Sequence, residues 1–187
     1  MFFRLPHRVG GIFVILLKKA QALNRKIERN LISKWEQVTG YKFQRKEYCV
    51  NLFYAGAHGP SFNNLSLDKN TAFYNIDEGN MLDMISHELG IHVLRPHLGP
   101  LELQFEREIP RITDNPRIYG HVSYMASESL AAFYNRKVLG RNALDVASSN
   151  DYQRFFAIYN RLYQDKLDPV KMYELGVKEY IREYTAL

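Results

Sequence analysis

Apolar residues recur every three or four positions from Ile12 to Val38, which is the period of an amphipathic helix. The pattern predicts one long helix that ends near Gly40. Its opposite face is basic and carries Lys18, Lys19, Arg25, Lys26 and Arg29. We therefore expect the helix to pack through one stripe and to present a positive face.

Two segments rich in aromatic and branched residues follow, and each predicts a strand. They are EYCVNLFYA at residues 47–55 and NTAFYNI at residues 70–76. The segment GAHGPSFNN between them is typical of a turn. We expect the two strands to lie in one small sheet.

The rest of the chain has helical patterns separated by proline. A helix that Asp77, Glu78 or Asn80 can cap must stop or kink before Pro96. Residues 96–118 are predicted to be a loop with a short helical piece at 101–108, because prolines divide them. Further helices are expected at 120–138, 150–164 and 169–184. The predicted fold class is α+β, mostly helical.

Composition indicates one globular domain over residues 1–187, with a basic helix in 1–46 and the rest in 47–187. Of the 187 residues, 46% are hydrophobic and 24% are charged. Cys49 is the single cysteine, which excludes an intrachain disulfide and a cysteine-rich zinc ribbon. No apolar run is long enough to span a membrane, and we expect a cytoplasmic protein although the N-terminus weakly resembles a signal peptide.

Charge is distributed unevenly along the chain. Residues 1–46 hold eleven Lys and Arg against Glu28 and Glu36, which gives this end a net charge of +9. The net charge of the whole chain is +5, so the remaining residues carry −4. The basic end is either an ordinary solvated helix face or a contact for an acidic partner such as a protein tail. No nucleic-acid-binding signature accompanies it, and we expect no nucleic acid.

The segment MLDMISHELGIHVLRPH contains the candidate chemistry. His87 and Glu88 are followed by His92 five residues after the first histidine, whereas zinc-peptidase helices usually space their histidines by four. In a regular helix the two imidazoles would lie about 140° apart, so a shared metal predicts a π-type turn between them. Gly90 fits a backbone that is distorted or closely approached there. The alternative is a pair of histidines that cap, pack or face solvent.

A third ligand is needed, and Glu128 is the candidate. It is the one acidic residue in HVSYMASESLAAFYN, and its helical neighbours are small or apolar, so its carboxylate should face packed protein. A metal is one natural partner for such a group. A salt bridge to Arg95 or Arg117 is the other.

HELGIHVLR together with ESLAAFY resembles the HExxxH zinc carboxypeptidases, namely the microtubule-associated tyrosine carboxypeptidases and their bacterial relatives with a QEGLA motif. The resemblance covers about residues 77–135. Ser127 and Ser129 stand where that pattern has Gln and Gly, so the second motif matches at its glutamate and only in part around it. The dipeptidyl-peptidase III family also has HExxxH but fits less well.

The resemblance implies a gluzincin-like fold, with a small β-sheet beside a metal-binding helix pair. It also implies a Zn²⁺ ion held by His87, His92 and Glu128, with Glu88 as general base. The expected activity is removal of a C-terminal, perhaps aromatic, residue from a peptide or protein by metal-activated water. Asp83, one turn before His87, either orients an imidazole or lies on the helix surface.

Substrate recognition is expected from residues near the two motifs. Arg95 and Arg117 are candidates for binding a terminal carboxylate, because a guanidinium does so with two hydrogen bonds. Tyr119, His121 and Tyr124 are candidates for donating a hydrogen bond to the developing oxyanion, and packing is the alternative role for the tyrosines. Two other interpretations stay open. One is a non-catalytic binding module that docks acidic partners through its basic helix, and the other is an endopeptidase or dipeptidyl-peptidase with the same metal chemistry.

Overall fold

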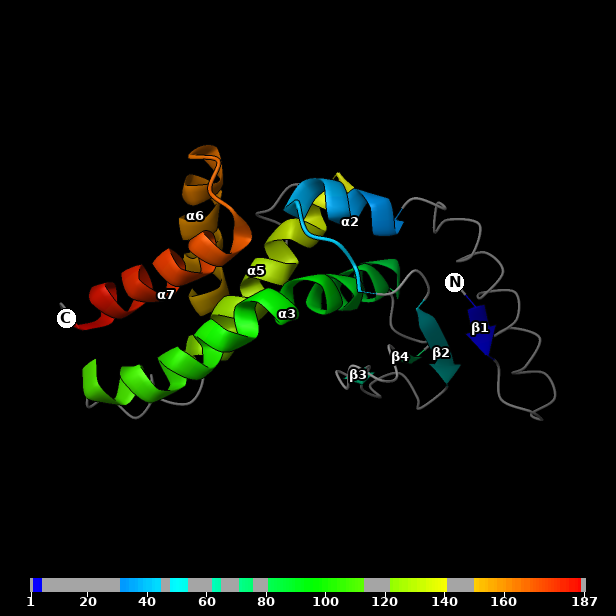
Figure 1. The fold of residues 1–187 in the computed structure, drawn as a ribbon, viewed down its shortest axis with the longest axis horizontal. Helices are drawn as coiled ribbons and strands as arrows, with labels where there is room; N and C mark the ends of the chain where they lie inside the picture. The colour runs from blue at the N-terminus through cyan, green and yellow to red at the C-terminus, as the bar shows by residue number, and fades with distance from the viewer. Residues whose placement is uncertain are drawn as a thin grey trace.

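The computed structural model describes residues 2–4, 31–44, 48–53, 62–64, 71–75, 81–112, 122–140 and 150–185. Its helices are α2 (Leu31–Thr39), α3 (Met81–Ile112), α5 (Val122–Leu139), α6 (Asn150–Gln164) and α7 (Pro169–Thr185). Its strands are β1 (Phe2–Arg4), β2 (Cys49–Phe53), β3 (Phe62–Asn64) and β4 (Thr71–Asn75). Figure 1 shows α5 between α3 and the α6–α7 pair, with α2 beside the first half of α3.

Helix α3 is longer than the sequence predicts. The helix does not stop before Pro96, and the loop expected at residues 96–100 and 109–112 is wrong, because α3 runs through Pro96 and Pro100. The short helical piece expected at 101–108 is part of α3. Both prolines are exposed, so water can hydrogen-bond the carbonyl groups that they leave without a helical donor. Burial of Leu98 and Ile109 in the same helix offsets the cost of the prolines.

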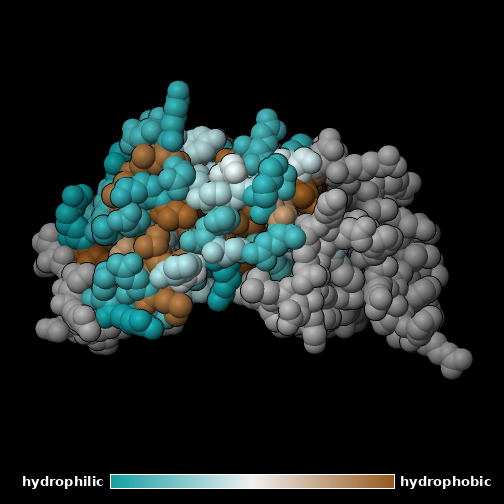
Figure 2. All heavy atoms as spheres, in the orientation of Figure 1, coloured by the Kyte–Doolittle hydropathy of each residue, from teal (hydrophilic) through white to brown (hydrophobic). Residues whose placement is uncertain are grey.

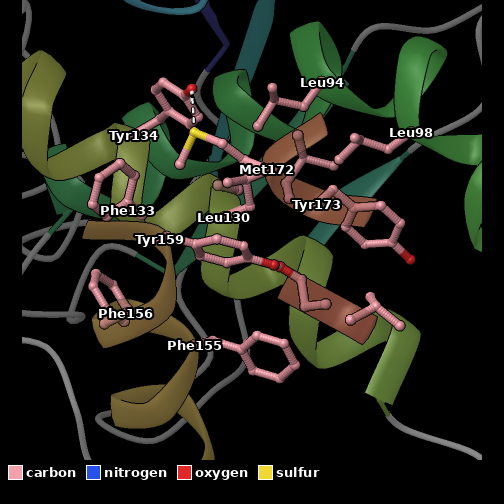
Figure 3. Packing of buried hydrophobic residues seen from close by; sticks show 14 of the residues in the cluster. Leu94, Leu98, Leu130, Phe133, Tyr134, Phe155, Phe156, Tyr159, Met172 and Tyr173 are labelled. Carbon is pink, nitrogen blue, oxygen red and sulfur yellow. Dashed lines mark hydrogen bonds between the residues drawn. The ribbon is translucent and has the colours of Figure 1, made fainter. Parts of the chain in front are cut away.

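Helix α5 is the centre of the core, and α3, α6, α2 and α7 all pack against it. Its Leu130 and Phe133 are fully buried, and the Phe133 ring lies against three aromatic rings of α6, those of Phe156, Tyr159 and Tyr163. Figure 3 shows most of these side chains together, with the Tyr134 hydroxyl donating to Met172 Sδ at 3.2 Å. The hydroxyl of Tyr159 donates to the carbonyl of Ala126 at 2.9 Å, which ties α6 to α5. The predicted helices at 120–138, 150–164 and 169–184 are confirmed by α5, α6 and α7.

Helix α2 packs on α3 through one large side chain. Trp35 is fully buried, and its Nε1 donates to Ser86 Oγ at 3.1 Å. A Cβ atom at Gly90 would lie closer than 3.0 Å to the Trp35 ring, so the glycine allows this contact. The helix ends at Gly40, whose φ of 77° is readily adopted by glycine. The predicted helix end is confirmed, while the basic face at residues 18–29 lies outside the described residues.

The predicted fold class, α+β with a gluzincin-like sheet beside a metal-binding helix pair, is wrong for the packed body of the protein. Strands at β2 and β4 do occupy the predicted segments, and the sheet has the order β1-β2-β4-β3 with β2 and β4 parallel. However, all described core residues except Tyr48 belong to helices. Apart from Tyr48, the interior that can be described is therefore built from helices.

The described surface is largely hydrophilic, with apolar residues exposed between polar ones (Figure 2). Ion pairs on it include Lys171 and Lys178 with Glu174, at 2.8 and 2.6 Å. Within the ranges that the structure describes, no helix is both long enough and apolar enough to cross a membrane.

Candidate functional site

The site lies where α3 faces α5. Glu128 stands on α5 between the fully buried Leu130 and the buried Ser127, and it faces α3. Its Oε2 accepts a hydrogen bond from His87 Nε2 at 2.9 Å, although the two residues are 41 positions apart. Both side chains are largely shielded from solvent, with 14% of His87 and 22% of Glu128 exposed. The fold therefore brings the first histidine of the motif into contact with Glu128.

A cavity of about 450 Å³ opens beside this pair. On α3, Asp83 and His87 are four positions apart, as are Met84 and Glu88, so two adjacent rows of side chains form one wall of the cavity. The remaining walls come from α5 and from the start of α6. The complete lining is Asp83, Met84, His87, Glu88, Tyr124, Glu128, Ala132, Asn135, Arg136 and Tyr152.

His92 is not in this cavity. The predicted π-type turn is wrong, because every residue from 81 to 112 is in regular α-helix. His92 is therefore rotated about 140° from His87 around α3. Its ring instead packs against Tyr48, with centroids 4.9 Å apart, and burial lowers the pKa of His92 below its usual value.

Two phenols, those of Tyr124 and Tyr152, line the cavity near Glu128. Partial burial raises the pKa of Tyr124, and the negative charges of Glu128 and Glu88 raise it further. Burial and Glu128 also raise the pKa of Tyr152. Both phenols are therefore neutral near pH 7, and the Tyr124 hydroxyl hydrogen-bonds the Glu128 carboxylate.

The residues fit a zinc ion only in part. Imidazole nitrogen and carboxylate oxygen are ordinary zinc donors, and two ligands of one tetrahedral ion lie about 3.3 Å apart. The 2.9 Å between His87 and Glu128 is close to that separation. His92, the expected second histidine ligand, is elsewhere. Among the described residues no group of three His, Cys, Asp or Glu side chains is placed to hold a metal ion.

The predicted substrate-binding residues have different outcomes. Arg95 is exposed and lines a second, smaller cavity of about 90 Å³, which shares Tyr124 and Glu128 with the larger one. Arg117, Tyr119 and His121 lie outside the described residues.

Three polar residues of the cavity, Asn135, Arg136 and Tyr152, were missed by the sequence analysis. Asn135 and Arg136 lie seven and eight positions after Glu128, so two turns of helix spacing would have found them. Tyr152 comes from a separate helix, and nothing in the sequence connects it with the site.

Comparison with known proteins adds no assignment: no protein-family model, no curated protein and no solved structure matches this chain.

Proposed function

We propose that the chain is a zinc-dependent peptidase of the carboxypeptidase type, with His87 and Glu128 as metal ligands and Glu88 as general base. One observation carries the proposal. Helices α3 and α5 bring His87 Nε2 within 2.9 Å of Glu128 Oε2, and Glu88 lines the same cavity. An imidazole, its paired carboxylate and a further carboxylate beside a cavity are suited to hydrolysis.

The roles of the residues follow from their positions. A bound zinc ion would supply an activated water and polarise the scissile carbonyl. Glu88 takes a proton from the attacking water and passes it to the leaving amine, so the C–N bond breaks after the new C–O bond has formed. Tyr124 and Tyr152 donate hydrogen bonds to the carbonyl oxygen as its negative charge grows.

The test combines metal content with hydrolysis. Purified wild-type protein supplied with zinc at neutral pH should hold about one ion per chain by elemental mass spectrometry, and Glu128→Ala should lose it. Glu88→Gln should keep the ion but hydrolyse peptides roughly a hundredfold to ten-thousandfold more slowly. Glu106→Gln is the matched control, because this exposed glutamate is on α3 but outside the larger cavity. It should retain both properties.

Two results would contradict the proposal: a wild-type protein that binds no zinc, or a Glu128→Ala variant that binds it as tightly as wild type. The first would favour the non-catalytic binding module. His92 gives a separate test of the arrangement. Because it lies on another face of α3, His92→Ala should weaken zinc binding less than His87→Ala does.

A further inference from the structure

A second hydrogen bond joins α3 to α5 beside the contact between His87 and Glu128. Asn135 Nδ2 donates to the backbone carbonyl of Asp83 at 3.0 Å, while His87 Nε2 donates to Glu128 Oε2 at 2.9 Å. Asp83 is one turn before His87 on α3. Asn135 is two turns after Glu128 on α5 and lies only about 20° away from it around the helix. The two bonds therefore connect the same face of α3 to the same face of α5.

The two bonds differ in how strongly they constrain the helices. His87 and Glu128 meet through side chains that rotate about several bonds, so this contact alone leaves α3 free to rotate slightly against α5. Asn135 is only 6% exposed, and its amide bonds a backbone atom, which moves only when α3 itself moves. The Asn135 bond therefore fixes the position of one helix on the other.

The requirement for stability does not explain an asparagine at this position. Its Oδ1 is buried and has no hydrogen-bond partner among the described residues, and an unsatisfied buried acceptor costs at least as much as an ordinary hydrogen bond contributes. The Asp83 carbonyl does not depend on Asn135, because in a regular helix it also accepts the backbone N–H four residues later. A leucine has the same branched shape without the unsatisfied oxygen. Asn135 is therefore suited to fixing alignment, a role that buried polar groups have in some helix assemblies.

Metal binding is sensitive to the rotation that Asn135 fixes. Ligand atoms must lie within about 0.2 Å of their ideal distance from a metal ion. A helix rotation of about 5° moves a side-chain atom that is roughly 5 Å from the axis by about 0.4 Å. A small change in the rotation of α3 is thus enough to misplace His87 relative to Glu128.

We propose that Asn135 is a positioning residue, which holds His87 in place against Glu128 by fixing the rotation of α3 on α5. This inference rests on the proposed function, in which these two side chains are the metal ligands. Asn135 acts through the helices and does not touch the ion. Its replacement by an apolar residue should therefore lower zinc affinity without lowering stability.

Asn135→Leu separates these two effects. In urea unfolding of the metal-free protein, its midpoint should equal or exceed that of wild type, because leucine removes the unsatisfied oxygen. In calorimetric titration with zinc, its dissociation constant should be about tenfold to a hundredfold higher than that of wild type, the usual effect of removing a group that orients a metal ligand.

Two further variants control for effects on folding. Asn135→Ala removes the donor without the added volume of leucine, so its zinc affinity should fall to the same extent whatever its stability. Tyr159→Phe is the matched control, because it removes another hydrogen bond to the backbone of α5, the one from the Tyr159 hydroxyl to the carbonyl of Ala126. This control should lower the urea midpoint and leave the zinc dissociation constant unchanged. Asn135 variants that bind zinc as tightly as wild type, or a control that loses affinity to the same degree, would overturn the inference.

A measurement without metal tests the same inference independently. The shielded Nε2–H of His87 should give a slowly exchanging signal in proton–nitrogen NMR spectra of the metal-free protein, assigned by its loss in His87→Gln. In Asn135→Leu this proton should exchange with water measurably faster, and unchanged exchange would overturn the inference. A wild-type protein that binds no zinc would contradict the proposed function alone, because the exchange measurement still decides whether Asn135 holds the two side chains together.

Discussion

Gly90 lies directly beneath the Trp35 ring, and replacing it with alanine should separate α2 from α3. The three ring atoms nearest to the new Cβ would all be closer than 3.0 Å. The ring is fully buried and its Nε1 is bonded to Ser86, so it has little room to move away. Overpacking of this kind costs about 1–3 kcal/mol. We expect the upper end of that range because several ring atoms clash at once.

Alanine also has a favourable effect, which must be subtracted. In a helix interior it is better than glycine by about 1 kcal/mol. The free energy of unfolding of Gly90→Ala should therefore fall by about 2 kcal/mol. In a Trp35→Leu background the ring is gone, and the same substitution should raise the free energy of unfolding by up to about 1 kcal/mol. The two effects differ by a coupling of about 3 kcal/mol.

Urea unfolding followed by circular dichroism on the four proteins of this cycle measures the coupling. A Gly90→Ala substitution with the same effect in both backgrounds would refute the packing of Trp35 on α3. A substitution that stabilises the wild-type background would refute it as well. Trp35→Leu is itself destabilising, so the comparison uses only the change caused by alanine within each background.

Three other predictions concern α3. Burial lowers the pKa of His92, so the unfolded chain binds more protons than the folded one as pH falls below about 6.5. With metal removed by EDTA, the free energy of unfolding should therefore fall more between pH 7.5 and pH 5 in wild type than in His92→Gln, and equal losses would contradict the burial. Pro96→Ala should raise the free energy of unfolding by about 2 kcal/mol in urea titrations, because it restores a helical hydrogen bond; a decrease would mean that α3 is not continuous there. Leu98→Ala should cost about 2–5 kcal/mol in thermal or urea unfolding, whereas Leu103→Ala, at a residue that is 57% exposed, should cost much less. Similar losses for the two leucines would contradict the predicted buried face.

The sequence by itself determined those features that depend on local periodicity. The end of α2 at Gly40 and the positions of α5, α6 and α7 follow from the spacing of apolar residues and from glycine at a helix end. His87, Glu88 and Glu128 could also be identified as candidate site residues from the sequence. His87 and Glu88 belong to the HExxxH motif, and Glu128 has small or apolar neighbours on its helix. Their nearness in space was a hypothesis that the contact between α3 and α5 supports.

Only the tertiary structure decided how the helices are rotated and where they continue. Proline patterns predicted a break at Pro96, but burial of apolar residues on both sides keeps α3 whole. The glycine in the motif predicted either a distorted backbone or a close approach. The Trp35 ring accounts for the close approach, and the regular helix leaves His92 on another face. Asn135 and Arg136 line the larger cavity because of the way α5 is rotated relative to α3. Which side chains meet across two helices depends on the rotation of each helix about its axis, and packing of the whole core sets that rotation.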